Sequence, residues 1–112
     1  MDTEKFVELT KTLDKKKKGK QEEMEKLQKY FDRFHLINRN SLNKGMYEKA
    51  QGSLSSIAET MVNTVQYLDV EIARLRNKRM RLPFENVELA EMQKTQGRNE
   101  LLFKEYLAEF PK

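Results

Sequence analysis

The chain has 112 residues, of which 36% are charged, with a formal net charge of +4, four glycines, two prolines and no cysteine. A chain of this length forms one domain with a modest core, and its low glycine and proline content favours long exposed helices over sheets or disorder. The lack of cysteine excludes disulfides, thiolate metal sites and a thiol nucleophile, which fits a reducing compartment.

The first expected helix covers residues 3–37. The lysine-rich stretch 15–20 interrupts its apolar face, and Gly19 costs up to about 1 kcal/mol inside a helix. We therefore expect this helix to be either continuous but weakly packed at this stretch, or broken. The apolar residues that follow one face at steps of three and four are Phe6, Leu9, Leu13, Met24, Leu27, Phe31 and Phe34.

A turn is expected at residues 38–41, because asparagine and serine favour local hydrogen bonds to the backbone. The short loop makes the second helix, residues 42–81, an antiparallel neighbour of the first. Helices of this length are stable mainly because they bury one face, so we expect the second helix at the centre, packed on both sides. Its unbroken apolar stripe consists of Tyr47, Ala50, Leu54, Ile57, Met61, Val65, Leu68, Ile72 and Leu75.

Pro83 marks the next boundary, since proline disfavours helical geometry at the residue before it, although a kinked continuous helix stays open as an alternative. A third helix is expected over residues 84–109. Its apolar residues are Phe84, Val87, Leu89, Ala90, Met92, Leu102, Phe103, Tyr106, Leu107 and Phe110. No segment alternates as a strand does. The predicted fold is all-α: a long antiparallel helical hairpin with a third helix, in one coiled-coil-like three-helix bundle over residues 1–112.

Catalytic chemistry has little support in the sequence. His35 is the only histidine, and although Asp32 precedes it by three residues, a di-metal bundle site needs a Glu-x-x-His from each of two helices. No glycine-rich phosphate loop, nucleophile elbow or zinc-ligand spacing is present. We expect a non-enzymatic protein without metal or cofactor, in which His35 is a partly buried residue near the turn.

The middle of the second helix carries more apolar residues than one buried stripe needs. The polar interruptions of the flanking helices, near residues 17 and 97, would face this stretch. Val62, Tyr67 and Val70 would then form an exposed apolar patch, although long lysine and arginine stems are an alternative cover. The candidate partner-binding residues are Met61, Val62, Val65, Tyr67, Val70 and Glu71.

Two basic clusters are candidate polyanion-binding sites, because clustered cations release counterions when they bind polyanions. The alternative is that both are solvated helix faces. The first cluster is Lys15, Lys16, Lys17, Lys18 and Lys20, and the second is Arg74, Arg76, Lys78, Arg79 and Arg81. The predicted function is a helical interaction module, such as an adaptor, assembly factor or export partner, that docks on a helical protein or on itself. The alternative is a small nucleic-acid-binding or phage-type regulatory protein that uses these clusters.

The segment Tyr67-Leu68-Asp69-Val70-Glu71 matches a Tyr-x-x-x-Asp/Glu signal. With its short, cysteine-free hairpin layout, the chain resembles the small helical partners of bacterial type VII secretion, which implies pairing with another helical protein. The Trp-x-Gly turn of that family is missing, since the turn reads Leu42-Asn43-Lys44-Gly45. No classical signal peptide and no stretch of about 18 apolar residues is present, so we predict a cytoplasmic location, with non-classical export as an alternative.

Overall fold

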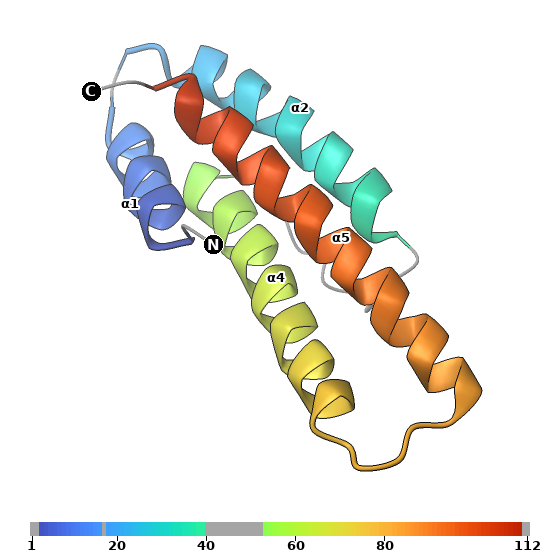
Figure 1. Ribbon diagram of the computed structural model, residues 1–112. Helices are drawn as coiled ribbons and strands as arrows, with labels where there is room; N and C mark the ends of the chain where they lie inside the picture. Colours follow the sequence, from blue (N-terminus) through green and yellow to red (C-terminus); the bar gives the residue numbers. More distant parts are fainter. Residues whose placement is uncertain (1–2, 17, 40–52, 111–112) are drawn as a thin grey trace.

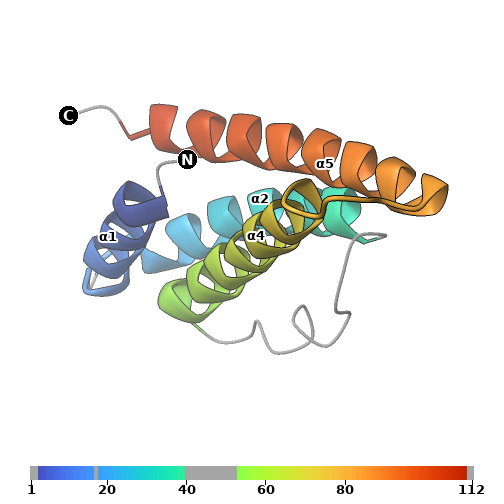
Figure 2. The same ribbon diagram turned by 60° about the horizontal axis from the view of Figure 1, so that its bottom comes forward.

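The computed structural model describes residues 3–16, 18–39 and 53–110, and within them the chain forms only helices (Figure 1). The predicted all-α class is confirmed, because these helices pack on one another as a bundle. Figure 2 shows α5 lying across one side of the other three helices. The helices are α1 (Thr3–Asp14), α2 (Lys20–Asn38), α4 (Leu54–Arg76) and α5 (Pro83–Ala108).

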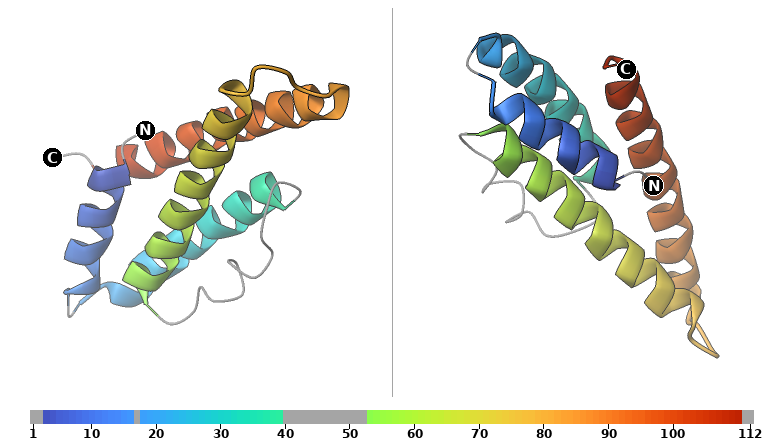
Figure 3. Two further views of the ribbon diagram at one scale, coloured as in Figure 1. Left: turned by 90° about the horizontal axis from the view of Figure 1, so that it is seen from below. Right: turned by 90° about the vertical axis from the view of Figure 1, so that its left-hand side faces the viewer.

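The first expected helix is broken into two. It stops at Asp14, and α2 starts after Gly19, which has a φ of +78° in the left-handed region. Glycine adopts this geometry without the steric cost of a Cβ atom. The lysines in between bring no apolar side chain to the core, so nothing stabilises a helix through this stretch. The two halves are free to pack at an angle, and α1 crosses α4 as a separate element (Figure 3).

The central position expected for the second helix is confirmed from Leu54 onward. The Ser53 hydroxyl accepts a hydrogen bond from the Ser56 amide at 3.1 Å and so caps the helix. Every residue of the expected stripe from Leu54 to Leu75 is buried, and α4 contacts α1, α2 and α5. The helix ends at Arg76, five residues before its predicted end at 81. The predicted start at 42, with Tyr47 and Ala50, lies outside the described residues.

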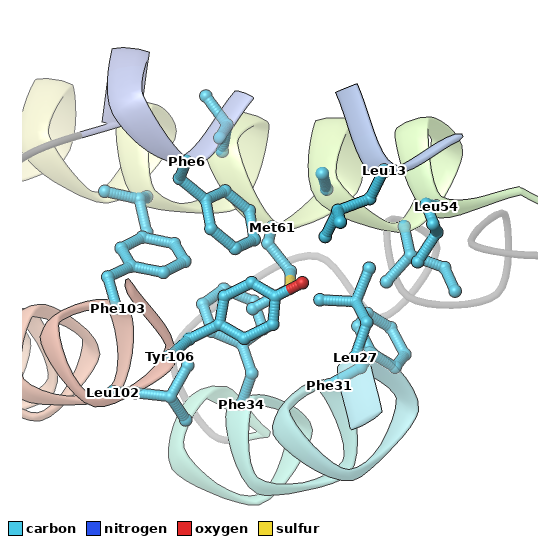
Figure 4. Packing of buried hydrophobic residues seen from close by; sticks show 14 residues of the cluster. Phe6, Leu13, Leu27, Phe31, Phe34, Leu54, Met61, Leu102, Phe103 and Tyr106 are labelled. Carbon is cyan, nitrogen blue, oxygen red and sulfur yellow. The ribbon is translucent and has the colours of Figure 1, made fainter. Parts of the chain in front are cut away.

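Aromatic rings from α1, α2 and α5 pack together against α4 in the main core (Figure 4). The ring centroid of Phe6 lies 4.7 Å from that of Phe103, with the two rings tilted. It lies 5.4 Å from the ring centroid of Tyr106, in an edge-on geometry. Such pairs stabilise a core by about 0.5–1.5 kcal/mol beyond the area they bury. Phe34 and Met61 complete this centre.

A buried pair of amides fixes how α2 lies along α5. Asn38 Nδ2 donates to Asn99 Oδ1 at 2.8 Å, and Asn99 Nδ2 donates to Asn38 Oδ1 at 3.0 Å. Both residues are fully buried. Because buried amides must be paired, this contact sets the end of α2 beside the middle of α5.

Beyond this point α4 and α5 continue as a two-helix arm, which we define as residues 68–92. The arm has its own small core of Leu68, Ile72, Leu75 and Leu89, with Met92 packed against it. It gives the molecule its longest dimension of 54 Å, and its end lies far from the connection between α1 and α2 (Figures 1 and 3). Phe84 and Val87, two of the apolar residues expected in the third helix, are exposed here because α4 and α5 are the only helices of the arm among the described residues.

Candidate functional site

Half of the predicted partner-binding residues belong to the core. Met61, Val62 and Val65 are buried among α1, α2 and α5, and Val62 is only 7% exposed. The expectation that Val62 lies in an exposed patch is therefore wrong. The physical reason is the break near Gly19, which turns α1 into a separate helix that covers this part of α4.

The other three predicted residues lie on or beside the outer side of α4. Val70 is 63% exposed and Tyr67 is also exposed, whereas Glu71 is partly buried and binds Arg74 at 2.9 Å. The hydrogen bond to Glu71 raises the pKa of the Arg74 guanidinium. Asn63, Gln66 and Arg74 each lie four residues from one member of this pair and are exposed. The only further apolar side chain three or four residues away is the small Ala73, so Tyr67 and Val70 form only a small patch.

A groove lined by both apolar and polar side chains lies between the end of α2 and the first half of α5. This groove has a volume of about 520 Å³. Leu36 and Val87 line it and are each 64% exposed, while Ile37 and Met92 are partly buried. Its polar lining carries both signs of charge, from Arg39, Glu88, Glu91 and Arg98, with Thr95 between them. We call this surface the α2–α5 groove.

The α2–α5 groove exists because the two helices have different lengths. The amide pair holds the end of α2 next to Asn99, and α5 extends more than ten residues past this contact toward Pro83. Among the described residues, α2 therefore leaves the side of the arm uncovered where Val87 and Met92 lie. Leu36 is exposed at the last turn of α2 for the same reason.

A second hollow of about 820 Å³ lies between α1 and the end of α5. Its apolar residues Leu9, Leu107 and Phe110 are only partly exposed, and Lys26 lies 4.7 Å from the Phe110 ring. This hollow offers no large exposed apolar side chain, so it is the weaker candidate for docking.

The two basic clusters lie at opposite ends of the molecule (Figure 1). Lys15, Lys16 and Lys18 are exposed at the connection between α1 and α2, and Lys20 lies 3.5 Å from Asp14. Lys17 lies outside the described residues. The second cluster lies at the end of the arm. The clusters therefore do not join into one basic face, as a single extended polyanion site would require.

The second cluster combines ion pairs with unpaired cations. Arg74 binds Glu71, and Lys78 binds the buried carboxylate of Glu85. Arg81 donates from Nη1 to the Leu75 carbonyl at 3.2 Å. Arg76 and Arg79 make no ion pair with any residue that the structure describes. The acidic residues that pair with this cluster, Glu71 and Glu85, belong to the arm itself.

Two titratable groups of the bundle have unusual or unexpected surroundings. Burial, with the negative charge of Glu23 beside it, raises the pKa of the Tyr106 hydroxyl far above its usual range. His35 is exposed on the last turn of α2, not partly buried as predicted. Asp32, three residues earlier, accepts a hydrogen bond from Gln28 at 3.1 Å. In the described part of the chain, no three histidine or acidic side chains gather as a metal site would need.

No helix among the described residues is long and apolar enough to cross a membrane. Comparison of the chain with protein-family models, with curated proteins and with solved structures finds no match.

Proposed function

We propose that the chain is a non-enzymatic helical interaction module, and that the α2–α5 groove takes a helix from a partner protein or from a second copy. The observation that carries this proposal is the pair of large apolar side chains, Leu36 and Val87, exposed on the two walls of one groove. On a small protein, a concave surface that combines exposed apolar side chains with a few polar groups is typical of a binding site.

A helix is the occupant that fits the groove best, because among the described residues α4 and α5 are the only helices of the arm. Its core is one seam of Leu68, Ile72, Leu75 and Leu89, whereas α4 contacts three helices in the main body. A docked helix would cover Val87 and Met92 and would extend the bundle along the arm. Its apolar side chains would follow steps of three and four, as in other helix-in-groove complexes.

The rim charges indicate how a partner would be oriented. Glu88 and Glu91 lie toward Pro83 at the start of α5, and Arg39 and Arg98 lie toward the amide pair of Asn38 and Asn99. A partner helix with cations near one end and acids near the other would match this order. Rim charges of this kind select partner and direction more than they add affinity.

The experiment is co-purification with a solution mass, carried out on two matched double variants. Leu36→Glu with Val87→Glu places two carboxylates in the groove, and Tyr67→Glu with Val70→Glu places two on the outer side of α4. All four residues are exposed, so both variants should keep the fold. We expect the groove variant to lose the co-purifying helical protein, or the self-association, that the wild type shows.

The outer-side variant should retain that association. If instead the outer-side variant loses it and the groove variant keeps it, the partner binds at Tyr67 and Val70 and the groove is not the site. The nucleic-acid alternative has less support because the basic clusters lie at opposite ends of the molecule. An export role, which the resemblance to secretion partners implies, stays a prediction.

A further inference from the structure

The connection between α4 and α5 is held in one shape by hydrogen bonds of four side chains. The two carboxylate oxygens of Glu85 accept hydrogen bonds from the Leu82 amide, at 3.0 Å, and from Lys78. Arg81 reaches back to the last carbonyls of α4, and its Nε donates to Asn86 at 2.7 Å. Lys78 and Arg81 are therefore used to build the loop.

Two other cations of the same segment have no such role. Arg76 and Arg79 are exposed and pair with no acidic residue in the described ranges. Beside them lie three exposed apolar side chains, Met80, Leu82 and Phe84, and Met80 is 89% exposed. We define residues 76–84 as the tip. An ordered loop thus presents free guanidinium groups and large apolar side chains together, at the far end of the arm (Figure 3).

We propose that the tip binds the surface of an anionic phospholipid membrane. Exposed apolar side chains gain by entering the region between headgroups and acyl chains, and nearby arginines gain by contact with anionic lipids. The long arginine stems allow Arg76 and Arg79 to hold their charges at the level of the phosphates while Met80 inserts.

The shape of the tip favours a membrane over a helical protein. Met80, Leu82 and Phe84 follow one another at steps of two across a turn and the start of α5, so they form no stripe that a partner helix could match. They also project from a convex end, whereas the α2–α5 groove is concave. A fluid bilayer interface adapts to a convex apolar end, but a protein partner would need a preformed pocket. This site is distinct from the groove and does not depend on the proposed helix docking.

The test is sedimentation of the full chain with phosphatidylcholine vesicles that contain or lack phosphatidylserine. We expect binding only to the vesicles with phosphatidylserine, and weaker binding as salt rises, because salt screens exposed charges. Arg76→Gln with Arg79→Gln should reduce binding about 25-fold, since one cation near an anionic surface is worth roughly fivefold. Met80→Gln with Phe84→Gln should also reduce it, although the charge is unchanged.

The matched control is Lys16→Gln with Lys18→Gln, which removes the same charge from the exposed cluster at the opposite end. It should bind nearly as the wild type does. The variant Leu36→Gln with Val87→Gln, which leaves the net charge unchanged, separates the two proposals, because it should weaken partner docking while the tip still reaches membranes. Equal losses in the tip and control variants would mean that net charge alone attracts the chain, and would overturn the proposal.

Insertion is measured directly by a single tryptophan, since the chain has none. Met80→Trp should show a blue shift in fluorescence when phosphatidylserine vesicles are added, and Lys16→Trp should not. Absence of a shift at position 80, or equal shifts at both positions, would contradict insertion of the tip. Binding to a DNA duplex but not to vesicles would assign the free arginines to nucleic acid and would also overturn the proposal.

Discussion

Replacing Asn99 with alanine removes the two hydrogen bonds, at 2.8 and 3.0 Å, that join it to Asn38 between α2 and α5. A typical intramolecular hydrogen bond contributes about 0.5–1.5 kcal/mol, so two lost bonds should cost about 1–3 kcal/mol. For a chain of this size that corresponds to a fall in Tm of roughly 5–15 °C. Asn63→Ala, at an exposed position on α4, is the matched control and should change stability by less than about 0.5 kcal/mol.

A double-mutant cycle with Asn38→Ala isolates the contact itself. The single change at Asn38 should cost more than that at Asn99, because Asn38 Nδ2 also donates to the Phe34 carbonyl at 2.8 Å. Groups in direct contact couple by about 0.5–3 kcal/mol, so the double variant should be less destabilised than the sum of the singles. The assay is urea unfolding followed by circular dichroism. Strictly additive losses, or a neutral Asn99→Ala, would refute the claim that this pair joins the two helices.

Three further stability predictions concern the central stripe, the arm and the two described glycines. Leu68→Asp should cost at least about 3 kcal/mol, because Leu68 is fully buried, whereas Lys16→Ala should leave Tm unchanged; equal losses would mean that the buried face is misassigned. The hydrogen bonds from Lys78 and from the Leu82 amide lower the pKa of the Glu85 carboxyl below the ordinary 4.5. The stability that these bonds contribute is therefore complete above pH 4.5 and is lost as the pH falls through the pKa of the folded state. Glu85→Gln should therefore lower Tm at neutral pH, with a gap to the wild type that closes in acid; a gap independent of pH would contradict this role. Gly19→Ala should destabilise the fold by about 1 kcal/mol, because φ at this residue is +78°. Gly97→Ala should stabilise it by a similar amount, because Gly97 lies inside α5 with open space around it. The change in Tm measures both effects.

Local periodicity was sufficient to predict the helices whose burial is continuous. The stripe from Leu54 to Leu75 places α4 at the centre, and Pro83 begins α5 because its missing amide donor is harmless in the first turn. The exact end of α4 was not predictable in this way. Basic residues are favourable at any helix C-terminus, so they did not mark the end at Arg76, where Asn77 caps the helix and Arg81 donates to the Leu75 carbonyl.

The surfaces were harder to predict because they depend on contacts between distant segments. Val62 is buried in the core where α1, α2 and α5 pack on α4, and α1 is a separate helix because the chain turns at Gly19 in the left-handed region. The α2–α5 groove depends on where Asn38 meets Asn99, 61 residues later. Leu36 gave no signal of exposure, since it continues an apolar run at the end of α2. Glu85 was not singled out either, although an acidic residue in the first turn after a proline is a recognisable signal of a helix start.

Hydrogen–deuterium exchange tests the groove most directly. The chain is measured alone and then in complex, either with the protein that co-purifies with it or with its own second copy at high concentration. We expect slower exchange on complex formation at the end of α2, near Leu36, and along the first half of α5, near Val87 and Met92. Exchange on the outer side of α4 should stay unchanged. Protection confined to the stretch of α4 around Tyr67 and Val70, with none in α5, would contradict the proposal that the groove binds the partner helix.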